Sequence, residues 1–256
     1  EKAQNLHERE REIKAARGKI LDRNGVELAA NQSVCTISVI HNQVKDPETV
    51  IRVLSEELGL PEAEVRKKTE KRSSREVIQS NVEKTRGDAI REMRLEGVKV
   101  DEDYKRYYPY GTLASTVLGF TGSENQGAYG IEAYYDSVLS GTNGQIVSAK
   151  NAWGTDMPFK YEKMYEAQNG NDLVLTIDVN IQRFVDKHLE QAVIEHEVQN
   201  KACAVVMDVK TGEILAMSTK PDFDPNSPNT IYDENVQAQL DAITDEDARQ
   251  KALLEA

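Results

Sequence analysis

Three sets of residues have types that often carry chemistry, and each lacks part of the pattern that its chemistry needs. Asp222, Asp224 and Asn226 alternate as at the start of a calcium loop, but Ser227 and Asp233 replace the required glycine and glutamate. Two cysteines are too few for a disulfide framework or a four-cysteine zinc site, and the histidines show no H-E-x-x-H pattern. The sequence therefore predicts no metal ligand, no cofactor-binding residue and no cofactor.

Composition excludes further classes of protein. The chain of 256 residues has a net charge of −12, so it has no general attraction for nucleic acid. No apolar run approaches the ~18 residues that a membrane-spanning helix needs, and the N-terminus has no signal-like apolar core. Hydrophobic residues make up 39% and aromatic residues 6%, which favours small or elongated bodies over one compact globule.

The first elements are predicted from turn and strand signals. Residues 1–16 favour helix but have no apolar stripe, so we expect a solvated lead-in. Asn24-Gly25 is a strong hairpin signal, because both central positions of a type I′ turn need positive φ. It predicts strands at about 18–22 and 26–30, and the Val, Ile and Thr content predicts another at 33–40.

Helices and strands then alternate irregularly. Asp46-Pro47 begins a helix that Gly59 ends, and Pro61 begins a second helix. A strand, a helix and an extended segment are expected at 76–82, 85–96 and 98–110. This mixture indicates an α+β fold, without regular βαβ repetition.

A second unit begins near residue 169. A short strand at 173–177 precedes a long helix capped by Asp178, and 202–218 reads as a hairpin whose turn contains Gly212. One helix, one hairpin and a short strand cannot close a domain alone. We therefore expect this region to be disordered or to borrow packing from elsewhere.

Five blocks, in order, resemble one family. They are RGKILDRNG (17–25), RYYPYGTLASTVLGFTG (106–122), GAYGIEAYYDSVLSGTNG (127–144), GNDLVLTIDVNIQ (170–182) and VVMDVKTGEILAMSTKPDFDPN (205–226). Together they resemble the class B penicillin-binding proteins, the membrane-anchored peptidoglycan D,D-transpeptidases. Within that family the chain is most similar to the sporulation-type and division-type members of Gram-positive bacteria.

The resemblance implies a domain order. Residues 1–16 would be a juxtamembrane lead-in that follows a membrane anchor, and 17–168 an elongated α+β pedestal, or dimerisation domain. Residues 169–256 would be the start of a transpeptidase α/β domain with an antiparallel sheet. Cys35 and Cys203 would then lie outside the membrane, as free and largely buried thiols.

The family's catalytic pattern is missing. Its nucleophile is the serine of an S-x-x-K motif, and no serine in this sequence has a lysine three residues later. Lys210-Thr211-Gly212 spells the family's K-T-G motif, but it occupies the expected hairpin turn, where glycine supplies positive φ. We therefore assign no catalytic residue to this chain and expect it not to react with penicillin.

Ionisable side chains recur within the glycine-punctuated blocks. We hypothesise that Arg17, Arg23 and Arg106 pair with Asp22 and Glu132 at the junction of pedestal and catalytic domain, because arginine forms bidentate pairs with carboxylates. The alternative is a set of weak surface ion pairs. The residues assigned to the structural family motif are Arg17, Gly18, Asp22, Arg23, Asn24, Gly25, Arg106, Pro109, Gly130 and Glu132.

The resemblance also implies a function. The chain would be the non-catalytic pedestal portion of a transpeptidase that cross-links stem peptides through an acyl-serine and binds β-lactams. Its partners would be peptidoglycan stem peptides and β-lactams in the longer parent, a polytopic membrane glycan polymerase and a second copy, on the extracytoplasmic face of the membrane. The alternative is a stand-alone interaction module that positions such a polymerase.

Overall fold

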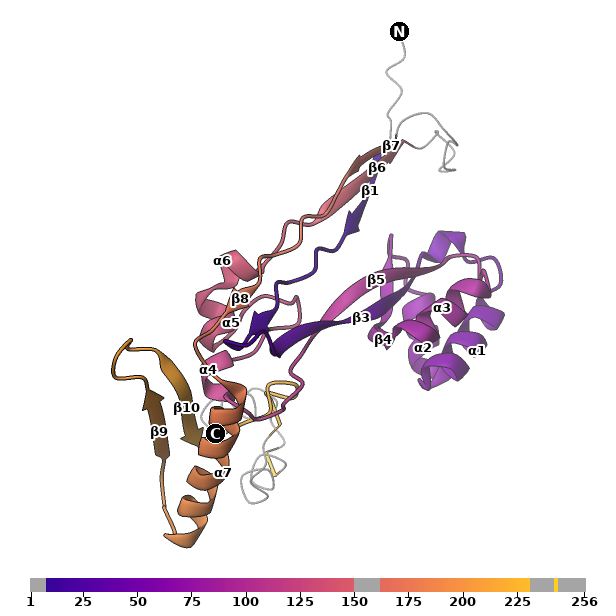
Figure 1. The fold of residues 1–256 in the computed structure, drawn as a ribbon. Helices are drawn as coiled ribbons and strands as arrows, with labels where there is room; N and C mark the ends of the chain where they lie inside the picture. Colours follow the sequence, from indigo (N-terminus) through magenta and orange to yellow (C-terminus); the bar gives the residue numbers. More distant parts are fainter. Residues whose placement is uncertain (1–7, 150–161, 231–241, 244–256) are drawn as a thin grey trace.

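The computed structural model describes residues 8–149, 162–230 and 242–243, and it is elongated and branched (Figure 1). Figure 1 shows a helical head around residues 41–92, an arm of strands at residues 8–13, 144–149 and 162–165, and a base of short helices within residues 115–139. A C-terminal unit (residues 176–230) lies at the opposite end from the arm. None of the helices in the described ranges combines the length and hydropathy that a bilayer crossing needs.

The strand that connects head and base is longer than the sequence predicts. β2 (Ile20–Leu21) and β3 (Glu27–Val39) form the expected hairpin, but its turn is not the predicted type I′: Gly25 has a φ of 83°, whereas Asn24 does not have positive φ. β3 continues without the expected break through Asn31-Gln32. The reason is β5 (Val98–Tyr107), which pairs antiparallel with β3 from Ala30↔Tyr107 to Val39↔Val98 and satisfies the backbone of those polar residues.

The head follows the predicted order. β4 (Glu76–Glu83) pairs with β3, and α1 (Pro47–Leu58), α2 (Glu62–Thr69) and α3 (Lys84–Glu92) pack on this sheet, with a short 3₁₀ turn at His41–Gln43. Asp46 caps α1 by accepting a hydrogen bond from the Thr49 N–H at 3.2 Å, and Gly59 ends it with a φ of 66°. The buried core of the head comprises Cys35, Ile37, Val39, Val50, Ile51, Leu54, Leu58, Val65, Ile78, Val82 and Ile90.

The arm was not predicted. β1 (Glu8–Ile13), β6 (Gly144–Ala149) and β7 (Glu162–Tyr165) form an antiparallel sheet in the order β1-β6-β7. A strand over Glu8–Ile13 thus replaces the helix-favouring lead-in expected there, because these residues pair with β6. The partner lies more than 130 residues later in the chain, so no local signal indicates it. The remaining lead-in residues, 1–7, lie outside the described residues.

The base holds a second core. It contains α4 (Ser115–Leu118), α5 (Gly130–Tyr134) and α6 (Asp136–Leu139), together with β8 (Leu173–Val174), which pairs parallel with β2. Its buried hydrophobic residues are Ile20, Leu28, Ala29, Tyr108, Leu113, Ala114, Leu118, Leu139 and Val179. Val179 belongs to the C-terminal unit, so this unit borrows packing from the base, one of the two outcomes expected.

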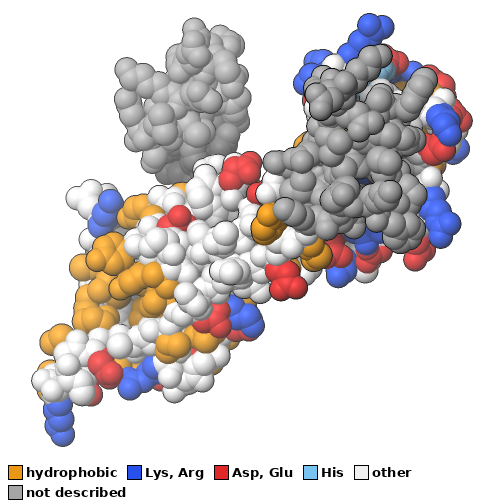
Figure 2. Space-filling model, turned by 90° about the horizontal axis from the view of Figure 1, so that it is seen from above, with side chains coloured by type: hydrophobic (Ala, Val, Ile, Leu, Met, Phe, Trp, Pro, Cys, Tyr) orange, Lys and Arg blue, Asp and Glu red, His pale blue; other side chains and the backbone are white. Residues whose placement is uncertain are grey.

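The C-terminal unit has the predicted elements. α7 (Val179–Glu195) begins at Asp178, whose carboxylate caps it, and β9 (Ala202–Met207) pairs with β10 (Ile214–Lys220). Figure 2 shows hydrophobic side chains gathered toward the end of the molecule that holds this hairpin, and charged side chains of both signs over the head. Val205, Met207 and Val209 of the hairpin region are more than half exposed.

Candidate functional site

The candidate site is a buried charge cluster centred on Glu132, a residue of α5 whose side chain is fully buried. Arg17 Nε donates to Glu132 Oε2 at 2.7 Å, and Arg106 Nε donates to Oε1 at 2.7 Å. The Tyr108 hydroxyl donates to Oε1 at 3.2 Å. One carboxylate therefore joins the chain before β2, the end of β5 and the base.

The remaining guanidinium N–H groups of the two arginines donate hydrogen bonds to further segments of the chain. Arg17 Nη1 donates to Asp136 Oδ1 at 2.6 Å, and Nη2 donates to the Glu132 carbonyl at 2.8 Å. Arg106 Nη1 donates to the Gly18 carbonyl at 2.8 Å. Two guanidinium groups thus face two carboxylates, which balances the charge. A buried ion pair with matched charges and many hydrogen bonds avoids the cost of an isolated buried charge.

Two groups of the cluster have shifted pKa values. Burial, together with the nearby negative charge of Glu132, raises the pKa of Tyr108, so its hydroxyl stays protonated as a donor. Burial raises the pKa of Asp136, but hydrogen bonds from the Gly127 N–H and from Arg17 outweigh it, and the pKa is lowered overall. Asp136 is therefore ionised at neutral pH, opposite the Arg17 guanidinium.

The prediction that Asp22 pairs with an arginine is wrong. Its fully buried carboxylate accepts main-chain N–H groups instead: those of Asn24 at 2.7 Å, Val26 at 2.8 Å and Val179 at 3.1 Å. These donors leave little room for a guanidinium. Because Val179 is the first residue of α7, Asp22 connects the β2–β3 turn to the start of the C-terminal unit.

Arg23 is likewise outside the buried cluster. Its side chain is 38% exposed and donates to Glu213 Oε2 at 3.3 Å, a partner that the sequence did not suggest. Asn24, next in the chain, donates through its side chain to Asp178 Oδ2 at 3.1 Å. Both contacts again cross from the β2–β3 turn to the C-terminal unit. The exposed pair contributes little stability, about 0–1 kcal/mol.

Asp22 makes the free energy of unfolding depend on pH in the acidic range. Burial raises its pKa, but main-chain hydrogen bonds from Val26, Val179 and Asn24 lower it overall. A carboxyl with a lowered folded-state pKa stabilises the fold above its unfolded pKa of about 3.9, and that contribution is lost as the pH falls through the folded pKa. Urea unfolding should therefore show falling stability below about pH 4.

The variant Asp22→Asn should be less stable by about 1–3 kcal/mol at neutral pH, since its amide presents a donor to one of the buried N–H groups. Its stability should also fall less steeply in acid, because the titrating group is gone. Equal acid slopes for Asp22→Asn and the unchanged chain in urea titrations would refute this role of Asp22.

Two glycines of the predicted motif, Gly18 and Gly130, lie where backbones touch, whereas Gly25 has open space around it. A Cβ atom on Gly18 would be 1.8 Å from the Asn171 carbonyl oxygen. Gly130 has a φ of 62° and lies against the backbone of Gly119. Pro109 follows Tyr108 and is exposed. The role of these residues as a structural motif of the family stays a prediction, but the contacts are those of crossing points between segments.

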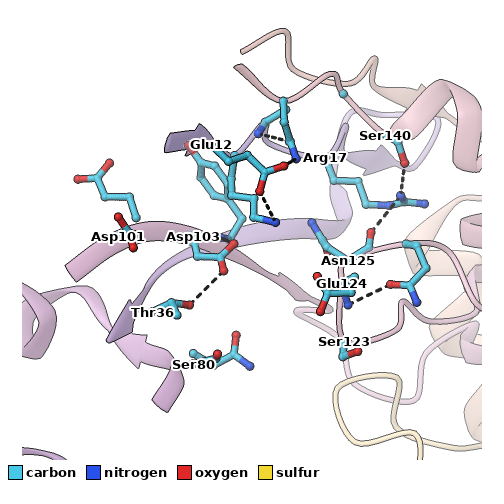
Figure 3. Close-up of a pocket in the computed structure, with 18 of the residues that line it drawn as sticks. Glu12, Arg17, Thr36, Ser80, Asp101, Asp103, Ser123, Glu124, Asn125 and Ser140 are labelled. Carbon is cyan, nitrogen blue, oxygen red and sulfur yellow. Dashed lines mark hydrogen bonds and ion pairs between the residues drawn. The ribbon is translucent and has the colours of Figure 1, made fainter. Parts of the chain in front are cut away.

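A cleft of about 600 Å³ lies beside the cluster (Figure 3). One wall holds Arg17, Asn125 and Ser140, which Arg17 Nη1 links through hydrogen bonds to the Asn125 carbonyl at 3.2 Å and Ser140 Oγ at 2.9 Å. The opposite wall comes from β3 and β5, where Thr36 donates to Asp103 at 3.2 Å. Within the described ranges, no three His, Cys, Asp or Glu side chains are grouped as a metal ion would require.

Two other sequence interpretations meet the structure here. Lys210-Thr211-Gly212 lies in the turn between β9 and β10, and Gly212 has a φ of 79°, as the turn interpretation expects. Cys35 is buried, but Cys203 is exposed, so the expectation that both thiols are buried is wrong for Cys203. Cys203 lies on β9, where alternate side chains point away from α7 and toward solvent.

Residues 12–175 match the Penicillin-binding Protein dimerisation domain, and residues 202–247 match the penicillin binding protein transpeptidase domain. The chain belongs to the penicillin-binding protein dimerisation-domain family. Its resemblance to class B penicillin-binding proteins and its α+β class are thereby confirmed.

Relatives agree with this assignment. Stage V sporulation protein D of Bacillus subtilis is 38% identical over 227 residues, which cover 86% of this chain and 35% of that protein. Peptidoglycan D,D-transpeptidase FtsI of Escherichia coli K12 is 28% identical, covering 86% of this chain and 38% of the relative. The chain thus spans little more than a third of the length of these two relatives.

Solved structures share the fold. A peptidoglycan synthetase from Bifidobacterium adolescentis aligns with a TM-score of 0.63 and 25% identity, covering 85% of this chain and 45% of that one. Penicillin-Binding Protein PBP2 of Helicobacter pylori, solved in complex with MreC, aligns with a TM-score of 0.67 and 21% identity. That alignment covers 92% of this chain and 46% of PBP2, and it supports the fold alone.

Sequence reasoning missed several members of the cluster. Asp136 is the clearest, and its signal was available: it follows Glu132 by four residues, a spacing that places two carboxylates on one face of a helical segment. Asn31, whose side-chain oxygen accepts from Arg106 Nη1 at 3.3 Å, had no such signal. Asn31 contacts Arg106 because the two residues are opposite each other on the paired strands β3 and β5, and the sequence alone does not give that register.

Proposed function

We propose that this chain is the non-catalytic pedestal portion of a membrane-anchored peptidoglycan D,D-transpeptidase. The longer protein would cross-link stem peptides through an acyl-serine and bind β-lactams. The observation that carries the proposal is the match to a dimerisation domain followed by a transpeptidase domain, in a sequence that contains no S-x-x-K motif. This chain would then position the catalytic domain, and the nucleophilic serine would belong to another part of the longer protein.

The proposal includes a domain division. Residues 1–16 form the lead-in, 17–168 the pedestal, and 169–256 the start of the transpeptidase domain. The exposed apolar side chains of β9, Val205 and Met207, support this, because a two-stranded sheet with a bare apolar face is stable only when further elements cover it. In the longer protein those elements would be the rest of the catalytic domain.

The proposed location is the extracytoplasmic face of the membrane. There the partners would be stem peptides for the longer protein, a polytopic membrane glycan polymerase and a second copy of the pedestal. The branched shape supports a positioning role, since the head and the C-terminal unit lie at separate ends and leave the head free for another protein (Figure 1).

Labelling with a fluorescent penicillin tests the proposal. The full-length gene product should become labelled, and prior treatment with unlabelled benzylpenicillin should prevent it. The 256-residue chain should remain unlabelled under the same conditions, because it contains no S-x-x-K serine. A labelled 256-residue chain, or an unlabelled full-length protein, would contradict the proposal.

A further inference from the structure

The loop after β10 forms hydrogen bonds, through Asn226, with the main chain of Tyr108. Asn226 Oδ1 accepts from the Tyr108 N–H at 3.0 Å, and Asn226 Nδ2 donates to the Tyr108 carbonyl at 3.0 Å. Tyr108 follows the end of β5 and has no strand partner of its own. The carboxamide bonds to both main-chain polar groups of Tyr108, as a neighbouring strand would, and the Tyr108 carbonyl also accepts from the Gly111 N–H at 3.2 Å.

Asn226 is itself held in place. The Asp224 carboxylate accepts from the Asn226 main-chain N–H and from Nδ2, both at 2.9 Å. Because Nδ2 donates to two oxygens and Oδ1 faces an N–H group, only one orientation of the amide satisfies all three partners. The Asp224 carboxylate therefore fixes the orientation in which the Asn226 amide contacts Tyr108.

Phe223 provides a second contact in the same loop. Its ring packs edge-on against Phe120, with ring centroids 5.7 Å apart, and lies 6.5 Å from the ring of Tyr129. Its N–H faces Ser115 Oγ at 3.4 Å. An aromatic cluster of this kind adds about 0.5–1.5 kcal/mol per pair beyond burial. The loop is thus attached by both polar and apolar contacts.

This loop is the second of two attachments that lie at the ends of the C-terminal unit, and the exposed Arg23–Glu213 pair is a further contact between those ends. The first precedes α7, where Asp22 accepts from the Val179 N–H and Asn24 donates to Asp178. A unit held at one place can rotate about it, whereas a unit held both before α7 and after β10 has a fixed orientation. Arg183 of α7 lies between these two attachments in the chain order, and its guanidinium carbon is 4.6 Å from the centroid of the Tyr110 ring.

We propose that residues 222–226 form a clasp that fixes the orientation of the C-terminal unit on the pedestal, with Asn226 as the positioning residue. The clasp ends on Tyr108, whose hydroxyl donates to Glu132, so it also joins the unit to the buried charge cluster. This inference goes beyond the proposed function and does not require that the longer protein be a transpeptidase.

Hydrogen exchange of the 256-residue chain tests the clasp through the Tyr108 amide. Asn226→Ala should speed its exchange by about tenfold, the effect of losing about 1.4 kcal/mol of local stability. Asn229→Ala is the matched control: Asn229 is an exposed asparagine of the same loop, and its side chain makes no hydrogen bond within the described part of the chain. Equal exchange in the two variants would overturn the proposal.

Amides of the head report whether the effect is local. The Ile37 amide should exchange at the same rate in Asn226→Ala and in the unchanged chain. If head amides accelerate as much as Tyr108, Asn226 supports the whole fold instead of one orientation, and the proposal is wrong.

A distance measurement tests orientation directly. Cys203 is exposed and Cys35 is buried, so a spin label attaches at β9, and Tyr134→Cys provides a second site on α5, where Tyr134 is 80% exposed. Pulsed electron resonance should give a narrow distance distribution for the doubly labelled chain and a broader one when Asn226→Ala is added. An unchanged width would overturn the proposal, and Asn229→Ala should leave the width as it is.

Discussion

Glu132→Gln should lower the free energy of unfolding by about 3–5 kcal/mol, the cost of breaking a buried ion pair by removing one partner. In the folded chain Glu132 accepts from Arg17, Arg106 and Tyr108. Glutamine keeps the shape but removes the charge, so Arg17 would keep only the Asp136 carboxylate and the buried Arg106 guanidinium would lose the carboxylate that it pairs with. Its NH₂ group would also face an arginine donor.

Urea unfolding followed by circular dichroism measures this effect. Glu124→Gln is the matched control, because Glu124 is an exposed glutamate eight residues earlier whose carboxylate has no partner in the described part of the chain. The control should stay within about 0.5 kcal/mol of the unchanged chain. Equal small losses in both variants would show that the cluster does not stabilise the pedestal.

Gly18→Ala should cost about 3 kcal/mol, because the added Cβ would overlap the Asn171 carbonyl oxygen at 1.8 Å. The neighbour is backbone, so it cannot rotate away as a side chain would. The Gly18 N–H donates to the Leu139 carbonyl and its own carbonyl accepts from Arg106. Separating the two segments would therefore also weaken the charge cluster.

Gly212→Ala separates this clash from the general cost of replacing glycine. Gly212 has open space around it and a φ of 79°, so alanine there should cost only the left-handed penalty of about 1–2 kcal/mol. Thermal unfolding of both variants gives the comparison. If Gly18→Ala unfolds no earlier than Gly212→Ala, the segments around residues 18 and 171 do not pack as closely as described.

Local signals predicted the elements that depend on local contacts. Asn24-Gly25 and the Asp46 cap with Gly59 are examples, because a turn or a helix end is decided by a few neighbouring residues. The arm was missed because the charged sequence over Glu8–Ile13 becomes a strand only when β6 pairs with it. The short helices α4, α5 and α6 were likewise missed, since tertiary packing in the base holds them.

The predictions about the site also succeeded where residue types decide a contact and failed where the overall fold decides it. Residue types and the family resemblance suggested that Arg17 and Arg106 meet Glu132, and the structure brings them together. Asp22 was misjudged because its partners are main-chain N–H groups, which every residue carries and which no sequence pattern marks. Arg23 was misjudged because its direction depends on how α7 and the β9–β10 hairpin pack beside the β2–β3 turn.

Glu132 and its arginines act as one unit that holds this domain together, and a double-mutant cycle between Arg106 and Glu132 measures that coupling. Arg106→Met and Glu132→Gln should each destabilise the chain in urea unfolding. Together they should cost less than their sum, with a coupling of about 1–3 kcal/mol. Additive losses, within about 0.5 kcal/mol, would contradict the account.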